Sequence, residues 1–344
     1  MTLPVWPHAC GEAPVRARLR ATRAAFQVEE LLGFEPDGEG EHCCLWVEKE
    51  GVNTAEVARR LARFAGIREA DVSWSGMKDR HAITRQWFSL HLLKREVDWR
   101  DWADPSVRLL QVSRHSRKLR RGTHRGNRFV IRLDDIEGDL SAFEARLDQI
   151  GQQGVPNYFG PQRFGRDGNN IEAARQWLAA GRPRKPRHLQ ALWLSSLRSL
   201  LFNEVLAARV RDDSWNQALA GELLMLDGSA SLFSDELSDA LVTRVASGDV
   251  HPTGPLAGRP GKLAPTADAL AVELAALEPW QELEQALHAA GLSAERRALR
   301  LQPREWQWRL LDGPAAELSF VLPRGCFATS LIREAADYVD AYNE

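Results

Sequence analysis

The chain has 344 residues, of which 44% are hydrophobic, and a formal net charge of −2 at pH 7. This length exceeds one average domain, so we expect two, and the hydrophobic fraction excludes a chain that is disordered by composition. No apolar stretch approaches the roughly 18 residues of a membrane span, and the N-terminus lacks the basic start and apolar run of a secretory signal. These features predict a cytoplasmic protein without a membrane partner.

The cysteines argue against a disulfide framework. There are four of them, Cys10, Cys43, Cys44 and Cys326, and none forms a C-x-x-C pair. Adjacent Cys43 and Cys44 would point to opposite sides of a strand, which also disfavours a structural zinc site. We therefore expect reduced thiols, as in most cytosolic proteins, and no metal.

The N-terminal third reads as strands with one covering helix. Val15–Arg20 alternates, with Arg16, Arg18 and Arg20 on one face, and a second strand contains Phe26, which is either a core residue or an aromatic platform for a base. Cys43–Lys49 predicts a third strand. A helix begins after Asn53, as the cap, with Glu56 reaching back, and ends at Gly66.

A short turn rich in ionisable groups follows. Val72–Ser75 and Arg85–Leu92 read as strands, and between them lies Gly76–His81, in which Asp79 stands between Lys78 and Arg80. Nearby cations favour the charged form of a carboxylate. Such an Asp is either a nucleophile or base, or a solvated turn residue.

The segment Arg114–Arg128 is strongly basic. It holds seven Arg or Lys and no acid, follows a predicted strand at Val107–Val112, and leads into the apolar strand Phe129–Leu133. Its glycines and its position between strands predict an ordered loop docked on a sheet, able to neutralise phosphates in a salt-dependent way. Asn127 near its end is by itself typical of a turn.

The rest of the chain is richer in helices. The aromatic stretch Gly154–Gly165 could stack bases or pack a domain boundary, and both interpretations stay open. Further elements are predicted helices at Asp139–Gly151, Ile171–Ala180, His188–Val210 and, with breaks at Pro279 and Gly291, Ala267–Ala298, and predicted strands at Trp306–Leu311 and Ala316–Leu322.

Several of these stretches resemble the TruD family of tRNA pseudouridine synthases. GMKDRHAITRQWFSL, from Gly76, is similar to its central signature, and further likenesses are FQVEE from Phe26, the Arg114–Phe129 segment, NYFGPQRFG from Asn157 and LPRGCFATS from Leu322. Ala25 departs from the family pattern, which has an acid there.

The resemblance implies an α+β fold. A catalytic domain with a mixed, mainly antiparallel sheet would span 1–153 and 303–344, and an inserted α/β TRUD domain would span 154–302. It also implies that Asp79 is the catalytic residue and that Phe26, Asn127 and Phe327 contact the substrate. A neighbouring cation is expected to keep Asp79 ionised, and Lys78, Arg80 and Arg20 remain alternatives for it. Without the resemblance, Phe327 would be interpreted as a core aromatic.

The implied substrate is tRNA, with uridine 13 in the D-arm region as the target. The isomerisation breaks the C1′–N1 bond, turns the base and joins C5 to C1′, which is redox-neutral, so we expect no cofactor. The resemblance implies no protein partner. A non-catalytic RNA-binding protein is the main alternative, since it would share the basic run; a metal-dependent nuclease would need several convergent carboxylates, whereas Asp79 stands among cations.

Overall fold

The computed structural model describes residues 3–93 and 95–342. The chain forms two compact units. We call residues 15–140, 303–325 and 336–344 the sheet unit, and residues 1–14, 141–302 and 326–335 the helical unit. The helical unit thus contains 1–14, 141–153 and 326–335 in addition to the segment predicted as an insertion. The division into a catalytic and an inserted domain, with boundaries at 154 and 302, stays a prediction.

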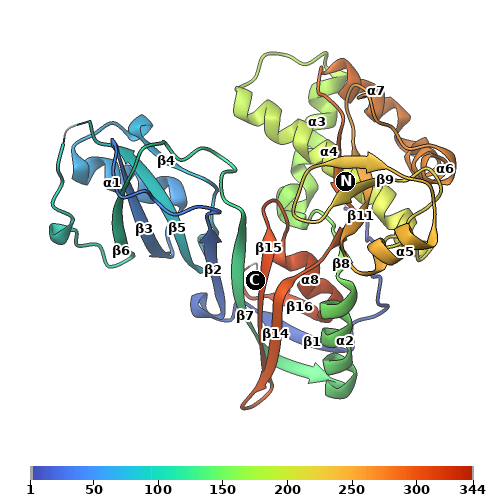
Figure 1. Cartoon of the computed structure of the whole chain (residues 1–344), viewed down its shortest axis with the longest axis horizontal. Coiled ribbons are helices and arrows are strands. Elements are labelled where there is room, and N and C mark those ends of the chain that lie inside the picture. Colours follow the sequence, from blue (N-terminus) through green and yellow to red (C-terminus); the bar gives the residue numbers. More distant parts are fainter. Residues whose placement is uncertain (1–2, 94, 343–344) are drawn as a thin grey trace. The chain divides into compact units, whose positions relative to one another are not determined.

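The sheet unit is built on one large sheet. Within the described ranges its central strand order is β14-β15-β7-β2-β5-β3-β6, with β1 pairing with β7 and β16, and β4 with β5 (Figure 1). Only the pairs β1/β16 and β2/β5 are parallel among the described strands, so the sheet is mixed and mainly antiparallel, as predicted. The strands are β1 Val15–Leu19, β2 Phe26–Leu31, β3 His42–Glu50, β4 Val72–Trp74, β5 Ile83–His91, β6 Val107–His115, β7 Gly126–Gly138, β14 Arg304–Leu311, β15 Ala315–Pro323 and β16 Asp337–Asp340.

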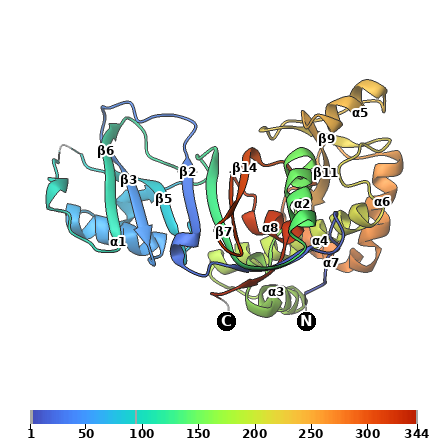
Figure 2. The ribbon, with the colours of Figure 1, turned by 90° about the horizontal axis from the view of Figure 1, so that it is seen from below.

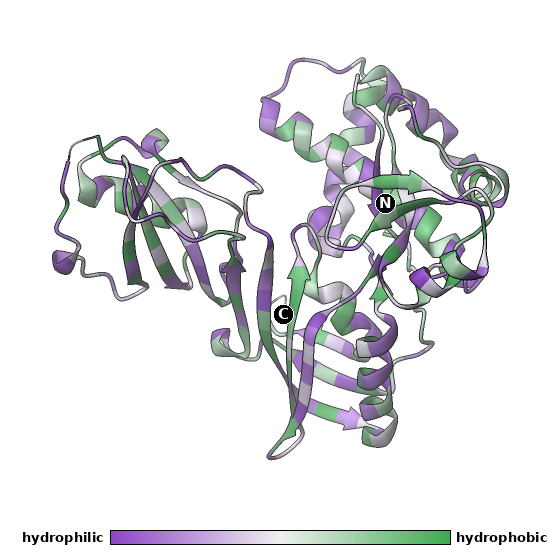
Figure 3. Cartoon of the chain, viewed as in Figure 1, coloured by the Kyte–Doolittle hydropathy of each residue, from purple (hydrophilic) through white to green (hydrophobic). Residues whose placement is uncertain are grey.

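Strand alternation and one helix place the core of this unit. In β1 every second residue is buried, and Figure 3 shows the same kind of alternation as bands of colour along the strands. Helix α1, Thr54–Ala65, packs its apolar stripe on β3, β5 and β6 (Figure 2). It ends at Gly66, whose φ of 63° is the left-handed conformation predicted for that cap. Asn53 is the N-cap residue, as predicted, but the predicted capping contacts are wrong: the Asn53 side chain makes no capping hydrogen bond, and Glu56 pairs with Arg60.

The helical unit is organised around α4, Arg187–Arg211. Its buried residues, among them Leu197, Leu200 and Phe202, form the largest part of the core. Helix α4 packs against α3, α6 and β11. The other elements are α2 Leu140–Gln153, α3 Asn169–Ala179, α5 Asp239–Ala246, α6 Ala267–Leu277, α7 Gln281–Ala289 and α8 Ala328–Ala335, with strands β8 Val155–Pro156, β9 Leu223–Leu226, β10 Leu232–Ser234, β11 Val250–Leu256, β12 Glu295–Ala298 and β13 Arg300–Leu301.

Most of the predicted elements are confirmed, and the exceptions have physical reasons. The helix predicted over Ala267–Ala298 is wrong beyond Gly291, because β12 pairs with β11 instead. Arg296 holds it there by donating to the Thr253 carbonyl at 2.7 Å and pairing with Glu273. The basic loop is also shorter than predicted, since β6 runs to His115 and β7 begins at Gly126.

Candidate active site

Asp79 lies in the turn between β4 and β5, and the backbone of this turn is anchored by the surrounding elements. The buried Lys49 of β3 donates from Nζ to the Asp79 carbonyl at 2.7 Å. Thr54, at the start of α1, accepts from the Lys78 N–H at 3.0 Å, and Gln86 of β5 donates to the Gly76 carbonyl at 3.1 Å. Three elements of the sheet unit therefore hold the turn in one conformation.

The Asp79 carboxylate is oriented on both oxygens. Its Oδ1 accepts from the His81 backbone N–H at 3.0 Å, and its Oδ2 lies 2.9 Å from Nη2 of Arg20. The Asp79 side chain is 31% exposed, whereas Arg20 is buried. The Arg20 guanidinium also lies over the ring of Phe26, 4.4 Å from its centroid. Arg20, Phe26 and Asp79 thus form one cluster, and Arg20 is the cation that pairs with Asp79.

The two sequence neighbours of Asp79 point elsewhere. Lys78 was a candidate partner of Asp79, but its Nζ lies 2.9 Å from Glu30 of β2, and both side chains are buried. Arg80, the other candidate, donates from Nε to the Gly51 carbonyl at 3.1 Å and its side chain lies toward the surface.

Glu30 is a site residue that the sequence reasoning missed. It accepts from Ser75 Oγ at 3.3 Å and from the Trp87 N–H at 3.2 Å in addition to Lys78, so it ties β2 to the turn. Its position offered a signal, because Glu30 shares a strand face with the buried Phe26 and Val28. An acid at such an inward position requires partners.

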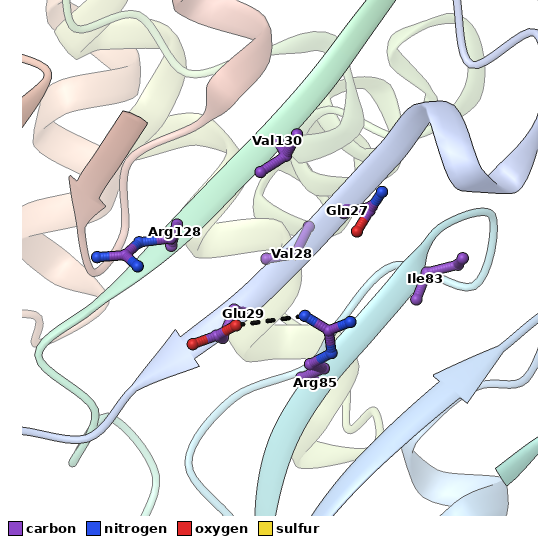
Figure 4. A pocket seen from close by; sticks show the side chains of 7 residues that line it. All are labelled: Gln27, Val28, Glu29, Ile83, Arg85, Arg128 and Val130. Atoms are coloured by element: carbon purple, nitrogen blue, oxygen red, sulfur yellow. Dashed lines mark hydrogen bonds and ion pairs between the residues drawn. The ribbon is translucent and has the colours of Figure 1, made fainter. Parts of the chain in front are cut away.

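Figure 4 shows the opposite, outward side of this part of the sheet. Glu29 pairs there with Arg85 at 3.5 Å beside a hollow of about 30 Å³, lined also by Gln27 and Arg128 among others. A space of this size holds roughly one water molecule. It is too small for a nucleotide, and none of the predicted site residues lines it.

Asn127 shares the inner face of the sheet with Phe26. In the register of β2 and β7, Asn127 lies opposite Glu30, and Phe26 lies opposite Ile131. Asn127 and Phe26 are therefore four residues apart along the sheet, roughly 13 Å at the rise of a strand. The Oδ1 atom of Asn127 is buried without a hydrogen-bond partner among the described residues, so its amide has an acceptor to offer.

Phe327 belongs to the helical unit and directly precedes α8. Its ring packs edge-on against Phe159, with centroids 6.1 Å apart, and the Arg163 guanidinium lies 5.9 Å from its centroid. Phe327 is thus part of an aromatic and cationic group within its own unit, whereas Arg20, Phe26, Asp79 and Asn127 belong to the sheet unit.

Burial changes the titration of groups near Asp79. It lowers the pKa of Lys49 to about 8, which the nearby Asp79 charge only partly opposes. Burial likewise lowers the pKa values of His81 and, together with the charge of Lys78, of His124. Both imidazoles are therefore neutral at pH 7, and the permanent cation at the carboxylate is Arg20.

The basic segment after β6 is docked on the sheet as predicted. Leu119 is buried and its N–H donates to Ser89 Oγ at 3.1 Å, while the Gly122 N–H donates to the Ser75 carbonyl at 2.7 Å. Next to and between these anchors the side chains of Arg117, Lys118, Arg120 and Arg121 are exposed. The loop therefore presents cations from a fixed backbone next to β4, the strand that leads into the Asp79 turn.

The described part of the chain contains neither a metal-binding cluster nor a membrane-spanning helix. Across 3–93 and 95–342, no three His, Cys, Asp or Glu side chains are grouped so that they could hold a metal ion. No described helix has the length and apolarity needed to cross a membrane.

Comparison with known proteins shows the class of protein to which this fold and site belong. A solved structure, the putative tRNA pseudouridine synthase D from Methanosarcina mazei, matches with a TM-score of 0.74 over 100% of this chain and 98% of that one, at 20% identity. The family model "tRNA pseudouridine synthase D (TruD)" matches residues 7–185 and 169–335. The fold is therefore that of a pseudouridine synthase.

Curated relatives extend the likeness over nearly the whole chain. The tRNA pseudouridine synthase D of Xanthomonas axonopodis pv. citri is 47% identical, covering 97% of this chain and 95% of the relative. That of Methylococcus capsulatus is 44% identical, covering 96% and 94%. The chain belongs to the TruD family of tRNA pseudouridine synthases, isomerases that convert uridine to pseudouridine.

Proposed function

We propose that this chain isomerises uridine 13, in the D-arm region of tRNA, to pseudouridine, with Asp79 as the catalytic residue. The observation that supports this most is the Asp79 carboxylate itself, which is partly exposed and oriented by Arg20 and by the His81 N–H. An ionised carboxylate on an anchored turn is preorganised to react with a sugar placed beside it.

The chemistry needs one carboxylate to begin. Asp79 either attacks C1′ of the ribose or removes a sugar proton, and in both routes the C1′–N1 bond breaks. The detached uracil turns and C5 joins C1′; in the first route this breaks the Asp79–C1′ bond, and in the second the sugar regains the proton that Asp79 removed. C5 then loses its proton while N1 gains one, so the product is an isomer of the substrate and Asp79 is free again. Arg20 orients the attacking carboxylate through the contact of its Nη2 with Oδ2, 2.9 Å apart, and it is a permanent cation at this place.

The remaining site residues serve binding in this proposal. The target base must leave its stack to be reached, and we assign a contact with the substrate to the ring of Phe26 in the sheet unit and, separately, to the ring of Phe327 in the helical unit. The unpartnered amide oxygen of Asn127 accepts a hydrogen bond from the nucleotide. Arg80 and the cations of the docked basic segment neutralise phosphates, whereas Lys78 acts through Glu30 on the turn. A cytoplasmic location, as expected from the sequence, is part of the same proposal.

The position can be tested with two transcripts. Unmodified tRNA and the same tRNA with uridine 13 replaced by cytidine are incubated with the protein, and pseudouridine is mapped by chemical adduct and primer extension. We expect one new stop at position 13 in the first transcript and none in the second. A stop elsewhere would overturn the assignment to uridine 13. Binding of both transcripts without product would favour a non-catalytic RNA-binding protein.

A further inference from the structure

Arg20 is held between two carboxylates, and only one of them belongs to the proposed catalytic residue. Its Nη2 lies 2.9 Å from Oδ2 of Asp79, and its Nη1 donates to Oδ2 of Asp340 at 2.8 Å. The side chain of Arg20 is 6% exposed and that of Asp340 is 10% exposed. Ion pairs this well shielded from water are stronger than surface pairs, and they fix geometry.

The C-terminal strand places Asp340 at this point. Strand β16 lies parallel to β1, with Asp340 opposite Leu19, and the Ala341 N–H donates to the Leu19 carbonyl at 3.0 Å. The Tyr342 N–H donates to the second carboxylate oxygen, Oδ1, of Asp340 at 3.3 Å. Asp340 is therefore held by the backbone of both strands directly beside Arg20.

Arg20 itself is in a costly backbone conformation. Its φ is 59°, the left-handed region that residues other than glycine rarely occupy, at a cost of roughly 1 kcal/mol or more. Such a conformation persists only where surrounding contacts enforce it. Here the contacts are the two carboxylates and the ring of Phe26.

The two terminal nitrogens of the Arg20 guanidinium contact different carboxylates, and this determines how Asp79 is bound. Because Asp340 takes Nη1, Asp79 receives a single N–H from Arg20, on Oδ2, and its Oδ1 accepts only the His81 backbone N–H among the contacts described. Without Asp340, the planar guanidinium would be free to turn and to donate to both oxygens of Asp79, as arginine often does with a single carboxylate. A carboxylate bound in that way is turned from its set orientation and is less available to react.

We propose that Asp340 is a positioning residue for the reaction at Asp79: it holds Arg20 so that Asp79 is paired and oriented through one oxygen but is not bound by the guanidinium on both oxygens. This inference rests on the proposed function. It assigns a task in the reaction to the C-terminal strand, which contains none of the residues of the family signature.

The test compares Asp340→Asn with a matched variant on the same strand. Asp337 also faces β1 and pairs with Arg16 at 3.8 Å, but both of those side chains are largely exposed, so Asp337→Asn removes a surface pair only. In single-turnover assays with tRNA, we expect Asp340→Asn to lower the rate at saturating tRNA by roughly tenfold to a hundredfold, the effect of a misplaced catalytic group. Its tRNA affinity and the rate of Asp337→Asn should remain at the wild-type level.

A purely structural role of Asp340 is distinguished by combining variants. In Arg20→Lys a single ammonium replaces the two guanidinium nitrogens that contact Asp79 and Asp340 separately. Adding Asp340→Asn to this variant should therefore lower the rate by less than twofold. Full additivity of the two effects, or a wild-type rate for Asp340→Asn, would overturn the inference.

A crystal structure of Asp340→Asn provides a readout independent of activity. We expect the Arg20 guanidinium to have turned toward both oxygens of Asp79, and an unmoved guanidinium would contradict the inference. If the wild-type protein makes no pseudouridine, the proposed function fails, while this structural result still decides whether Asp340 positions Arg20.

Discussion

At the scale of single residues, two buried cations hold Asp79 at different places. Arg20 contacts its carboxylate and Lys49 contacts its backbone carbonyl, so orientation of the side chain and conformation of the turn are controlled separately. The turn residues Lys78 and Gly76 are bound in addition by the sheet and α1. We infer that substitutions at Lys49 act on the stability of the turn, whereas substitutions at Arg20 act on the carboxylate.

Lys49 predicts how stability depends on pH. Burial lowers its pKa in the folded protein to about 8, against the ordinary value of 10.5 in an unfolded chain. Between these values the unfolded chain binds more protons, so the contribution of Lys49 to the free energy of unfolding rises with pH from about 8 to 10.5, by about 3 kcal/mol in full. Below pH 8 both states are protonated and the cost of burying the charge is fully present.

The measurement is urea unfolding of wild type and Lys49→Met at several pH values from 7.5 to 10.5. We expect the stability of wild type to rise relative to Lys49→Met across this window. The variant Lys118→Met, at an exposed lysine of the same unit, should follow the wild-type curve. Parallel curves for wild type and Lys49→Met would contradict the predicted titration of Lys49.

Some residues of the site could be predicted from the sequence, and others could not. The central motif indicated Asp79, and the alternation of Val15–Arg20 indicated Arg20 as one of three candidate partners. Lys78 and Arg80 were candidates only because they adjoin Asp79 in sequence, and neighbouring side chains of an extended turn point apart. The partner of Asp79 is instead Arg20, which directly follows β1 and lies 59 positions earlier in the chain; only the pairing of the strands brings it near. No local pattern indicated Asp340.

At the scale of elements, the docked basic segment, which we expect to bind RNA, is attached to the strands on either side of the Asp79 turn. Its backbone is bound to Ser75, at the end of β4, and to Ser89 of β5, so the exposed Arg117 and Arg120 project from an ordered loop. Cations on an ordered loop lose little further freedom on binding RNA. We expect the segment to contribute affinity without touching the reacting sugar.

Neutralising two of these cations should therefore weaken binding in a salt-dependent way. For Arg117→Gln combined with Arg120→Gln, we expect the slope of log affinity against log salt to become shallower by about 0.7 to 0.9 for each phosphate that the variant no longer neutralises. The rate at saturating tRNA should not change. The matched control is Arg68→Gln combined with Arg100→Gln, two exposed arginines of the same unit paired with Asp71 and Asp98. An unchanged slope for the first pair would place the RNA elsewhere.

Elements with strong periodicity were predictable, and those defined by distant partners were not. The alternation in Phe26–Leu31 and the apolar stripe of α1 identified these elements from the sequence. Strand β12 was predicted as helix because its residues, Glu295 to Ala298, favour a helix locally, and only pairing with β11 makes it a strand. The pairing of β8 with β13 is two residues long and carries no periodic signal.

At the scale of the whole molecule, each unit is assembled from segments far apart in the chain. In the helical unit, Arg146 of α2 donates to the carbonyls of Glu334 and Cys10, at 2.8 and 2.5 Å, and so binds two segments more than 300 residues apart in the chain to one helix. The sequence texture changes near residue 154, which suggested a boundary there. Contacts of this range have no local signature, so the grouping of 1–14, 141–153 and 326–335 with the helices could not be predicted.

The central claim is that Asp79 performs the isomerisation, and Asp79→Asn tests it most directly. Asn keeps the size of the side chain and an acceptor for the His81 N–H, but it neither attacks C1′ nor takes a proton. Under single-turnover conditions with unmodified tRNA, we expect no pseudouridine from the variant, a loss of at least about a thousandfold, with tRNA affinity close to that of wild type. Pseudouridine formed by Asp79→Asn at a rate near that of wild type would contradict the claim.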